Sequence, residues 1–195
     1  MSFPNSQSLH HKRNMLSSLF HMMSREIIDP NTGQLAFYFT MNMKSVITVY
    51  ADKEKQRPLL ECKRTVFIGM EWDVFDLENA NQHIGHFKAD LMRNLKTLGR
   101  ENWEITDPGG SPLLIFEADS TDSIGKRMMD NFTNLYNPNF QYNIWDANKK
   151  PVARIWSKHG LWNFCYDMAF EEKVTDVERK MSIALLAAMM LMLKK

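Results

Sequence analysis

The stretch that most constrains the fold is the apolar run at residues 181–193, which reads Met-Ser-Ile-Ala-Leu-Leu-Ala-Ala-Met-Met-Leu-Met-Leu. It has no charged residue, and Ser182 is its only polar side chain. Ala, Leu and Met favour helices. A helix of this length spans about 20 Å, whereas the hydrocarbon core of a bilayer is ~30 Å thick. The run is therefore too short to cross the hydrocarbon core of a bilayer easily.

The same run is apolar on every side, so it cannot lie on a protein surface as an ordinary amphipathic helix. We therefore expect a helix that the rest of the chain encloses. Its predicted core side chains are Ile183, Leu185, Leu186, Met189, Met190 and Leu193.

The composition limits the class of protein. A chain of 195 residues suits one domain or two small ones. A net charge of +1 argues against a dedicated nucleic-acid-binding protein, which would be clearly basic. The two cysteines, Cys62 and Cys165, form no CxxC pair and fit a reducing compartment. No secretory signal is visible in residues 1–20. We expect a cytoplasmic monomer with no nucleic-acid partner.

A recurring unit predicts β-hairpins. In each copy a β-branched residue stands two positions before an Asp, and turn-forming residues follow. Large residues at every second position are typical of a strand. Asp, Asn, Pro and Gly are turn residues, because Asp and Asn cap their own backbone and Gly accepts positive φ. The four units are at residues 25–29, 72–76, 103–107 and 142–146.

Returning strands follow these units. Phe37, Phe39, Met41 and Met43 are predicted to share one strand face. Further strands are predicted at residues 46–50, 59–68, 113–116, 152–156 and 162–166. The total is ten to twelve strands, spaced as in an antiparallel meander. Their irregular spacing disfavours a solenoid or a propeller. Short peripheral helices are predicted at residues 90–100 and 121–135.

Residues 1–24 are polar and contain no acidic residue, so we place them outside the barrel domain, which we assign to residues 25–195. Apolar residues between positions 15 and 23 recur at roughly helical spacing. The segment is therefore read as a poorly ordered N-terminus with a short docking helix, an interfacial membrane helix or an organellar transit peptide.

The strands and the apolar helix together predict one architecture. Eight strands make a barrel that its own side chains fill, and about twelve strands leave a wider lumen. An empty apolar lumen forfeits packing contacts, so a helix must fill it. We expect a mostly β fold with a central α-helix: a roughly twelve-stranded closed antiparallel β-barrel that encloses the helix at residues 181–193, with one or two short peripheral helices.

In this order of elements the chain resembles the tubby C-terminal-like superfamily, and most closely its LURP-one-related and phospholipid-scramblase-like branch. The resemblance covers residues 25–195. It rests on four stretches, at residues 75–85, 103–110, 142–155 and the closing helix from Ser182. The first three are generic hairpin sequences individually, and their order before an apolar helix is more specific.

No catalytic motif is visible in the sequence. Gly125-Lys126 lacks the rest of a phosphate-binding loop, and no G-x-S-x-G elbow occurs. His83 and His86 are a close pair, but two residues on opposite faces of a strand could not share a metal ion, so they are interpreted as surface or turn histidines. We expect a protein that is not an enzyme and that needs no cofactor.

Acidic residues precede the closing helix. The resemblance to scramblases associates this place with calcium, for which Asp167, Glu171, Glu172 and Asp176 are the candidate ligands. The spacing does not match an EF-hand, and the alternative is a solvated turn in which Thr175 or Asp176 caps the helix.

The resemblance also implies lipid binding, because tubby-like domains bind phosphoinositides. Basic residues near an anionic membrane contribute about 1 kcal/mol each. The candidate residues are Arg93, Lys96, Arg100, Lys126, Arg127, Lys149 and Lys150. We expect a module that binds phospholipids, phosphoinositides or a membrane surface from the cytoplasmic side. The alternatives are phospholipid scrambling, with or without Ca²⁺, and a signalling scaffold for a protein partner with no lipid role.

Overall fold

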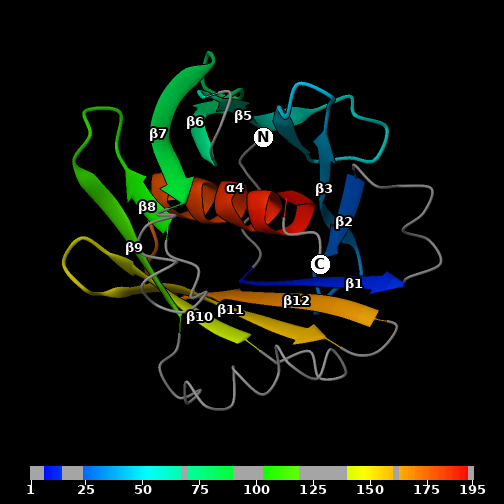
Figure 1. The fold of residues 1–195 in the computed structure, drawn as a ribbon. Coiled ribbons are helices and arrows are strands. Elements are labelled where there is room, and N and C mark those ends of the chain that lie inside the picture. Colours follow the sequence, from blue (N-terminus) through cyan, green and yellow to red (C-terminus); the bar gives the residue numbers. More distant parts are fainter. Residues whose placement is uncertain are drawn as a thin grey trace, which may run out of the picture.

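The computed structural model describes residues 7–14, 24–66, 70–89, 103–118, 140–159 and 163–192. Within these residues, twelve antiparallel strands form a closed barrel around one helix, α4 (Asp176–Met192) (Figure 1). Each strand pairs with the next one in the chain, and β1 pairs with β12 to close the barrel. This confirms the mostly β fold with a central helix that the sequence predicts. The strands are β1 (Ser8–Asn14), β2 (Ser24–Ile28), β3 (Leu35–Met41), β4 (Ile47–Tyr50), β5 (Pro58–Arg64), β6 (Glu71–Asp76), β7 (Gln82–Ala89), β8 (Trp103–Thr106), β9 (Pro112–Ala118), β10 (Phe140–Asp146), β11 (Pro151–His159) and β12 (Asn163–Phe170).

Alternating burial shows how the strand sequences face the core. In β6, Trp72, Val74 and Asp76 are buried, and the residues between them are partly exposed. Side chains on a strand point to opposite faces in turn, so this pattern places one face of β6 against the lumen. The aromatic rings of Trp72 and Phe87 stack there at a centroid distance of 5.4 Å.

The predicted turn chemistry at the ends of the hairpin units is present. The Asp29 carboxylate accepts a hydrogen bond from the backbone N–H of Asn31 at 2.8 Å. Asp107 and Asp146 each accept two such bonds from residues two and four positions later, all at 2.8 Å. Asp76 accepts one from Glu78 at 3.1 Å. In each of the four hairpins, the Asp at the end of the first strand therefore fixes the turn that follows.

The up-and-down connectivity gives the barrel two different ends. In a barrel of sequential antiparallel strands, alternate connections lie at opposite ends. One end, here called the turn end, carries the tight turns that follow β2, β4, β6, β8 and β10, together with the link from β12 to α4. The other, the connection end, carries the β3–β4 turn and the ends of the strands that flank residues 15–23, 67–69, 90–102, 119–139 and 160–162.

The helix α4 begins at the turn end with a capping box. The N–H of Glu178 donates to the Thr175 hydroxyl oxygen at 3.3 Å, and the Thr175 N–H donates back to the Glu178 carboxylate at 2.8 Å. This confirms Thr175 as the helix cap. The polar group of Ser182 is also satisfied, because its hydroxyl donates to the Glu178 carbonyl oxygen at 2.8 Å.

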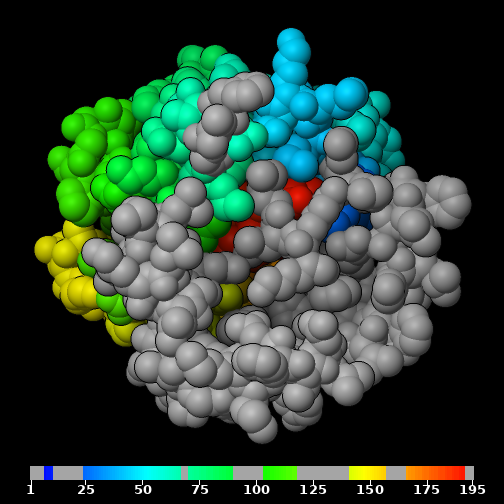
Figure 2. Space-filling view, in the orientation of Figure 1, coloured from blue at the N-terminus to red at the C-terminus, as the bar shows by residue number. Residues whose placement is uncertain are grey.

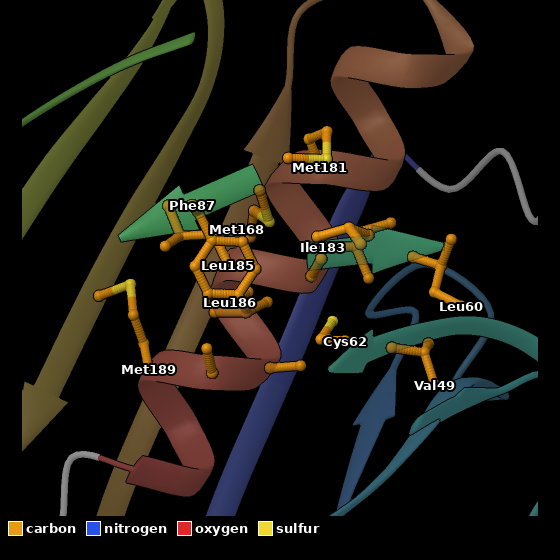
Figure 3. Packing of buried hydrophobic residues seen from close by; sticks show 14 of the residues in the cluster. Val49, Leu60, Cys62, Phe87, Met168, Met181, Ile183, Leu185, Leu186 and Met189 are labelled. Atoms are coloured by element: carbon orange, nitrogen blue, oxygen red, sulfur yellow. The ribbon is translucent and has the colours of Figure 1, made fainter. Parts of the chain in front are cut away.

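The interior of the barrel is filled by α4. Every side chain from residue 179 to residue 191 is buried, and the helix contacts β2, β3, β4, β5, β7 and β11. In the space-filling view only a small part of the red helix is visible (Figure 2). The close-up shows helix side chains packed among residues of several strands (Figure 3). Those labelled are Met181, Ile183, Leu185, Leu186 and Met189 of α4 with Val49, Leu60, Cys62, Phe87 and Met168 of the strands.

The structure corrects the N-terminal boundary of the barrel. β1 pairs with β12 over seven residue pairs, from Ser8 opposite Ala169 to Asn14 opposite Asn163. Residues 8–14 therefore belong to the barrel, which does not begin at residue 25 as the sequence predicts. The strand was missed because Ser-Leu-His-His-Lys-Arg-Asn is polar and lacks alternating large apolar residues. Its Leu9 is buried in the core.

Several other predictions lie outside the described residues. They are the short helices at residues 90–100 and 121–135, the apolar segment between positions 15 and 23, and the core position Leu193. Among the described residues α4 is the one helix, and it is not long and apolar enough to cross a membrane.

Candidate functional surfaces

The predicted basic residues do not form one described cluster. Lys149 and Lys150 are exposed in the β10–β11 turn, at the turn end. The Lys149 amine forms an ion pair with the Glu117 carboxylate at 2.8 Å. Arg93, Lys96, Arg100, Lys126 and Arg127 lie outside the described residues. They fall in segments 90–102 and 119–139, whose flanking strands end at the connection end.

Other cations of the turn end are also paired. Lys53 lies 2.6 Å from Glu26, and Arg57 forms an ion pair with Glu78. Glu26, Glu78 and Glu117 therefore each pair with one cation of this end.

The connection end presents an exposed methionine. Met43, in the β3–β4 turn, is 93% exposed and is followed by Lys44. The Asn42 side-chain oxygen accepts hydrogen bonds from the N–H groups of Lys44 and Val46, at 2.9 and 3.0 Å. The Trp72 indole N–H donates to the Ser45 carbonyl at 3.2 Å. These bonds fix the turn, so Met43 is held out in solvent.

The sequence pattern wrongly predicts that Met43 lies in a strand. The alternation from Phe37 to Met43 predicts one strand face, but β3 ends at Met41 and residues 42–46 form the turn. Asn42 could have predicted the end of this strand. A short polar side chain that bonds the backbone two residues later favours a turn over a strand.

Two of the four predicted calcium ligands take part in separate interactions. Asp167 forms an ion pair with His10 across the β1–β12 seam, and Asp176 lies 2.6 Å from the Lys180 amine. The other two, Glu171 and Glu172, lie in the link that leads to α4, where Glu171 is partly exposed and Glu172 is exposed. In the described ranges no group of three or more His, Cys, Asp or Glu side chains could hold a metal ion.

A buried ion pair joins α4 to the barrel wall. The Lys180 amine lies 2.7 Å from the Asp76 carboxylate, and the two side chains are 7% and 5% exposed. Burial by itself lowers the pKa of Lys180, but hydrogen bonds to Asp176 and Asp76 outweigh it, so the pKa is raised. The neighbouring Arg179 lies over the Phe170 ring at 4.4 Å, and burial lowers its pKa.

A β-bulge places His83 and His86 on the same outer face. In the β6–β7 ladder Val74 is opposite Gly85, whereas Phe75 is opposite His83, so Ile84 is an extra residue. Ile84 and Gly85 are both buried, and the histidines on either side of them are partly exposed. The sequence prediction that the two histidines point to opposite faces is therefore wrong, because strict alternation fails at the bulge.

The two histidines share a carboxylate. His86 Nδ1 lies 3.0 Å and His83 Nε2 lies 3.5 Å from the same oxygen of Asp73. His86 Nε2 lies 3.4 Å from the Glu71 carboxylate. The His83 ring also packs beside Phe75 at a centroid distance of 5.2 Å. Two imidazoles and two carboxylates thus form one partly exposed cluster on the outer face of β6 and β7.

Comparison with models of known protein families and a search of curated proteins both gave no match for this sequence.

Proposed function

We propose that this chain is a non-enzymatic, tubby-like module that binds an anionic phospholipid surface through its connection end. The observation that carries the proposal is the exposed Met43, held beside Lys44 on a turn that the Asn42 and Trp72 hydrogen bonds fix. An apolar side chain with an adjacent cation suits the boundary between acyl chains and anionic headgroups. Because α4 fills the lumen, a ligand is expected on the outer surface of the barrel.

The topology supports the choice of this end. The segments that contain Arg93, Lys96, Arg100, Lys126 and Arg127 begin and end at the connection end, as the β3–β4 turn does. Lys149 and Lys150 follow β10 at the opposite end, and Lys149 is paired with Glu117. We therefore remove these two lysines from the proposed lipid-binding set and keep the other five.

The test is co-sedimentation of the full chain with vesicles of phosphatidylcholine alone and with phosphatidylserine or a phosphoinositide added. Binding is expected with anionic vesicles at low salt and is expected to weaken as salt rises. Met43→Ser with Lys44→Glu is expected to weaken binding about tenfold or more, because it removes an apolar contact and reverses a charge. The matched control is Lys149→Glu with Lys150→Glu, which changes charge at the other end.

Two outcomes contradict the proposal. One is the absence of binding to anionic vesicles at low salt, which would favour a scaffold for a protein partner. The other is equal loss of binding in the Met43/Lys44 variant and in the Lys149/Lys150 control. Scrambling of lipids would require α4 to leave the barrel, so a scrambling assay with fluorescent lipid in the same vesicles separates that alternative.

A further inference from the structure

We propose that β1 is exchanged between two copies of this chain, so that each barrel is closed by the β1 of the other copy in a strand-swapped dimer. The inference concerns the closure of the barrel and does not depend on the proposed lipid binding. Domain swapping requires that an element leave its own molecule and find the same surroundings in a second copy. The pairing and the side chains of β1 both favour such an exchange.

β1 is attached to the barrel almost entirely through β12. It pairs with β12 over seven residue pairs, and the N–H of Phe170 donates to the Gln7 carbonyl oxygen at 2.8 Å just beyond them. In the described strands one pair, His10 opposite Ile28, joins β1 to β2. Every other seam of the barrel has at least three pairs. β1 accordingly lies along β12 and at a steep angle to β2 (Figure 1). The β1–β2 seam is therefore where the barrel opens most easily.

Few of the described side chains hold β1 in place. The strand has the polar sequence Ser-Leu-His-His-Lys-Arg-Asn. Among the β1 side chains that the structure describes, Leu9 is the one in the core, at 2% exposed, whereas Ser8 and His10 are partly exposed. His10 forms an ion pair with Asp167 of β12. β1 thus depends strongly on its backbone bonds to β12, which any copy of the strand can make.

A second copy restores the interactions that β1 loses when it leaves its own barrel. The edge of β12 requires a strand of matching register, because a slip of one residue would turn Leu9 to the outer face. The β1 of a second copy has that register by identity, so its Leu9 enters the same core position and its His10 meets the same Asp167. A strand from another protein would have to reproduce both features. A second copy of this chain is therefore the partner that fits.

The length of the link and the protein concentration set the conditions for exchange. Residues 15–23 join β1 to β2. A chain of this length reaches roughly 30 Å when extended, about the diameter of a small domain. Because the same bonds form in both states, the balance between them depends on concentration. The monomer is expected in dilute solution, and the dimer is expected to increase as the concentration rises.

The experiment mixes two proteins that a disulfide can join in this way only after exchange. One is the variant Lys12→Cys/Cys165→Ser, and the other is the wild-type chain. Residues 12 and 165 are directly opposite in the β1–β12 ladder. The Cα atoms of such a pair lie about 4.5–5.5 Å apart, a distance that a disulfide bridges. The mixture is incubated at rising concentration, diluted and oxidised. The expected product is a covalent dimer whose yield rises with the incubation concentration, with its disulfide mapped to residues 12 and 165.

The matched control is Met43→Cys/Cys165→Ser, which places the new thiol on an exposed turn where it meets the wild-type chain only by collision. A second measurement uses Lys12→Cys alone, oxidised as a dilute monomer so that the disulfide holds β1 on its own barrel. Light scattering is expected to show a dimer for the concentrated wild-type chain and its loss in this oxidised variant. Circular dichroism first shows that the variants are folded, and the wild-type measurement needs no variant.

Three results would overturn the proposal. The first is a wild-type chain that stays monomeric at every concentration. The second is a yield of covalent dimer from the Lys12→Cys/Cys165→Ser mixture no higher than that from the Met43→Cys/Cys165→Ser control. The third is an oxidised Lys12→Cys chain that dimerises as readily as the wild type, which would place the contact between copies elsewhere on the barrel.

Discussion

The methyl carbon of Met181 lies 2.7 Å from the position that a Cβ atom on Gly85 would occupy. The β7 bulge turns the Gly85 backbone inward, so the helix and the strand approach each other where no side chain intervenes. A second neighbour, the carbonyl oxygen of Thr106, is also 2.7 Å from that position. The bulge that brings His83 and His86 together on the outside is thus the same feature that admits Met181 on the inside.

Gly85→Ala is expected to destabilise the fold by about 1–3 kcal/mol, since overpacking forces shifts in neighbouring atoms. The free energy of unfolding in urea measures the effect. Gly109→Ala is the control, because its added Cβ meets only an Asp107 oxygen at 3.3 Å. Met181→Ala in the Gly85→Ala background should recover part of the loss, although the Thr106 carbonyl remains. Equal stability of the Gly85 and Gly109 variants would contradict this packing.

Leu186→Lys or Ala187→Asp is expected to abolish folding or solubility. Both side chains are at most 1% exposed, and an unpaired charge buried there costs several kcal/mol. Val177→Lys, in the first turn of the same helix and 38% exposed, should be tolerated. The readouts are soluble yield and circular dichroism. A folded, soluble Leu186→Lys protein would show that the helix is not enclosed.

Lys180→Met is expected to cost about 3–5 kcal/mol of unfolding free energy, because Asp76 would remain buried without its partner. Adding Asp76→Asn should restore much of that loss by removing the uncompensated charge. The double-mutant cycle is measured by urea unfolding at neutral pH. If the single Lys180→Met variant were as stable as the double variant, the pair would not contribute in this way.

The same pair predicts a pH dependence. The pKa of Lys180 is raised in the folded state, so its contribution is fully present below the unfolded-state pKa of about 10.4. That contribution is lost as pH rises above this value and through the raised folded pKa. The stability difference between wild type and Lys180→Met should therefore be constant near neutrality and shrink above about pH 10. If the stability difference instead grew as the pH became more alkaline, the predicted direction of the pH dependence would be wrong.

Cys62 is expected to be unreactive in the native protein. Its side chain is fully buried, and burial raises the pKa of the thiol, which disfavours the reactive thiolate. In a Cys165→Ser background, a thiol-reactive disulfide reagent at pH 8 should modify Cys62 at the rate of unfolding. Rapid modification under native conditions would show that the lumen admits the reagent.

Much of the fold follows from local patterns in the sequence. The Asp residues at positions 29, 76, 107 and 146 predict turns because their carboxylates bond the backbone that follows, and all four do so. The enclosed helix is predicted because residues 181–193 are too short to span a membrane and too apolar to lie on a protein surface. These features depend on short-range chemistry and on hydrophobic burial, and both can be predicted from the sequence alone.

The missed features depend on partners far away in the chain. β1 is polar, and it becomes a strand because the edge of β12 offers it backbone bonds. Lys180 reaches Asp76 over a separation of 104 residues, which no local pattern reveals. The bulge at Ile84 was also missed, because the alternation rule assumes an uninterrupted ladder.

The closure of the barrel by β1 and β12 has a consequence for how the chain folds. The strands at the seam are brought together by residues such as His10 and Asp167, which are 157 positions apart. Long-range pairings of this kind must offset a large loop-closure entropy, so they form slowly. During synthesis the twelve strands emerge before α4, which supplies the centre of the core. Until α4 leaves the ribosome, the earlier strands have apolar faces with nothing to cover them, a state that is prone to aggregation.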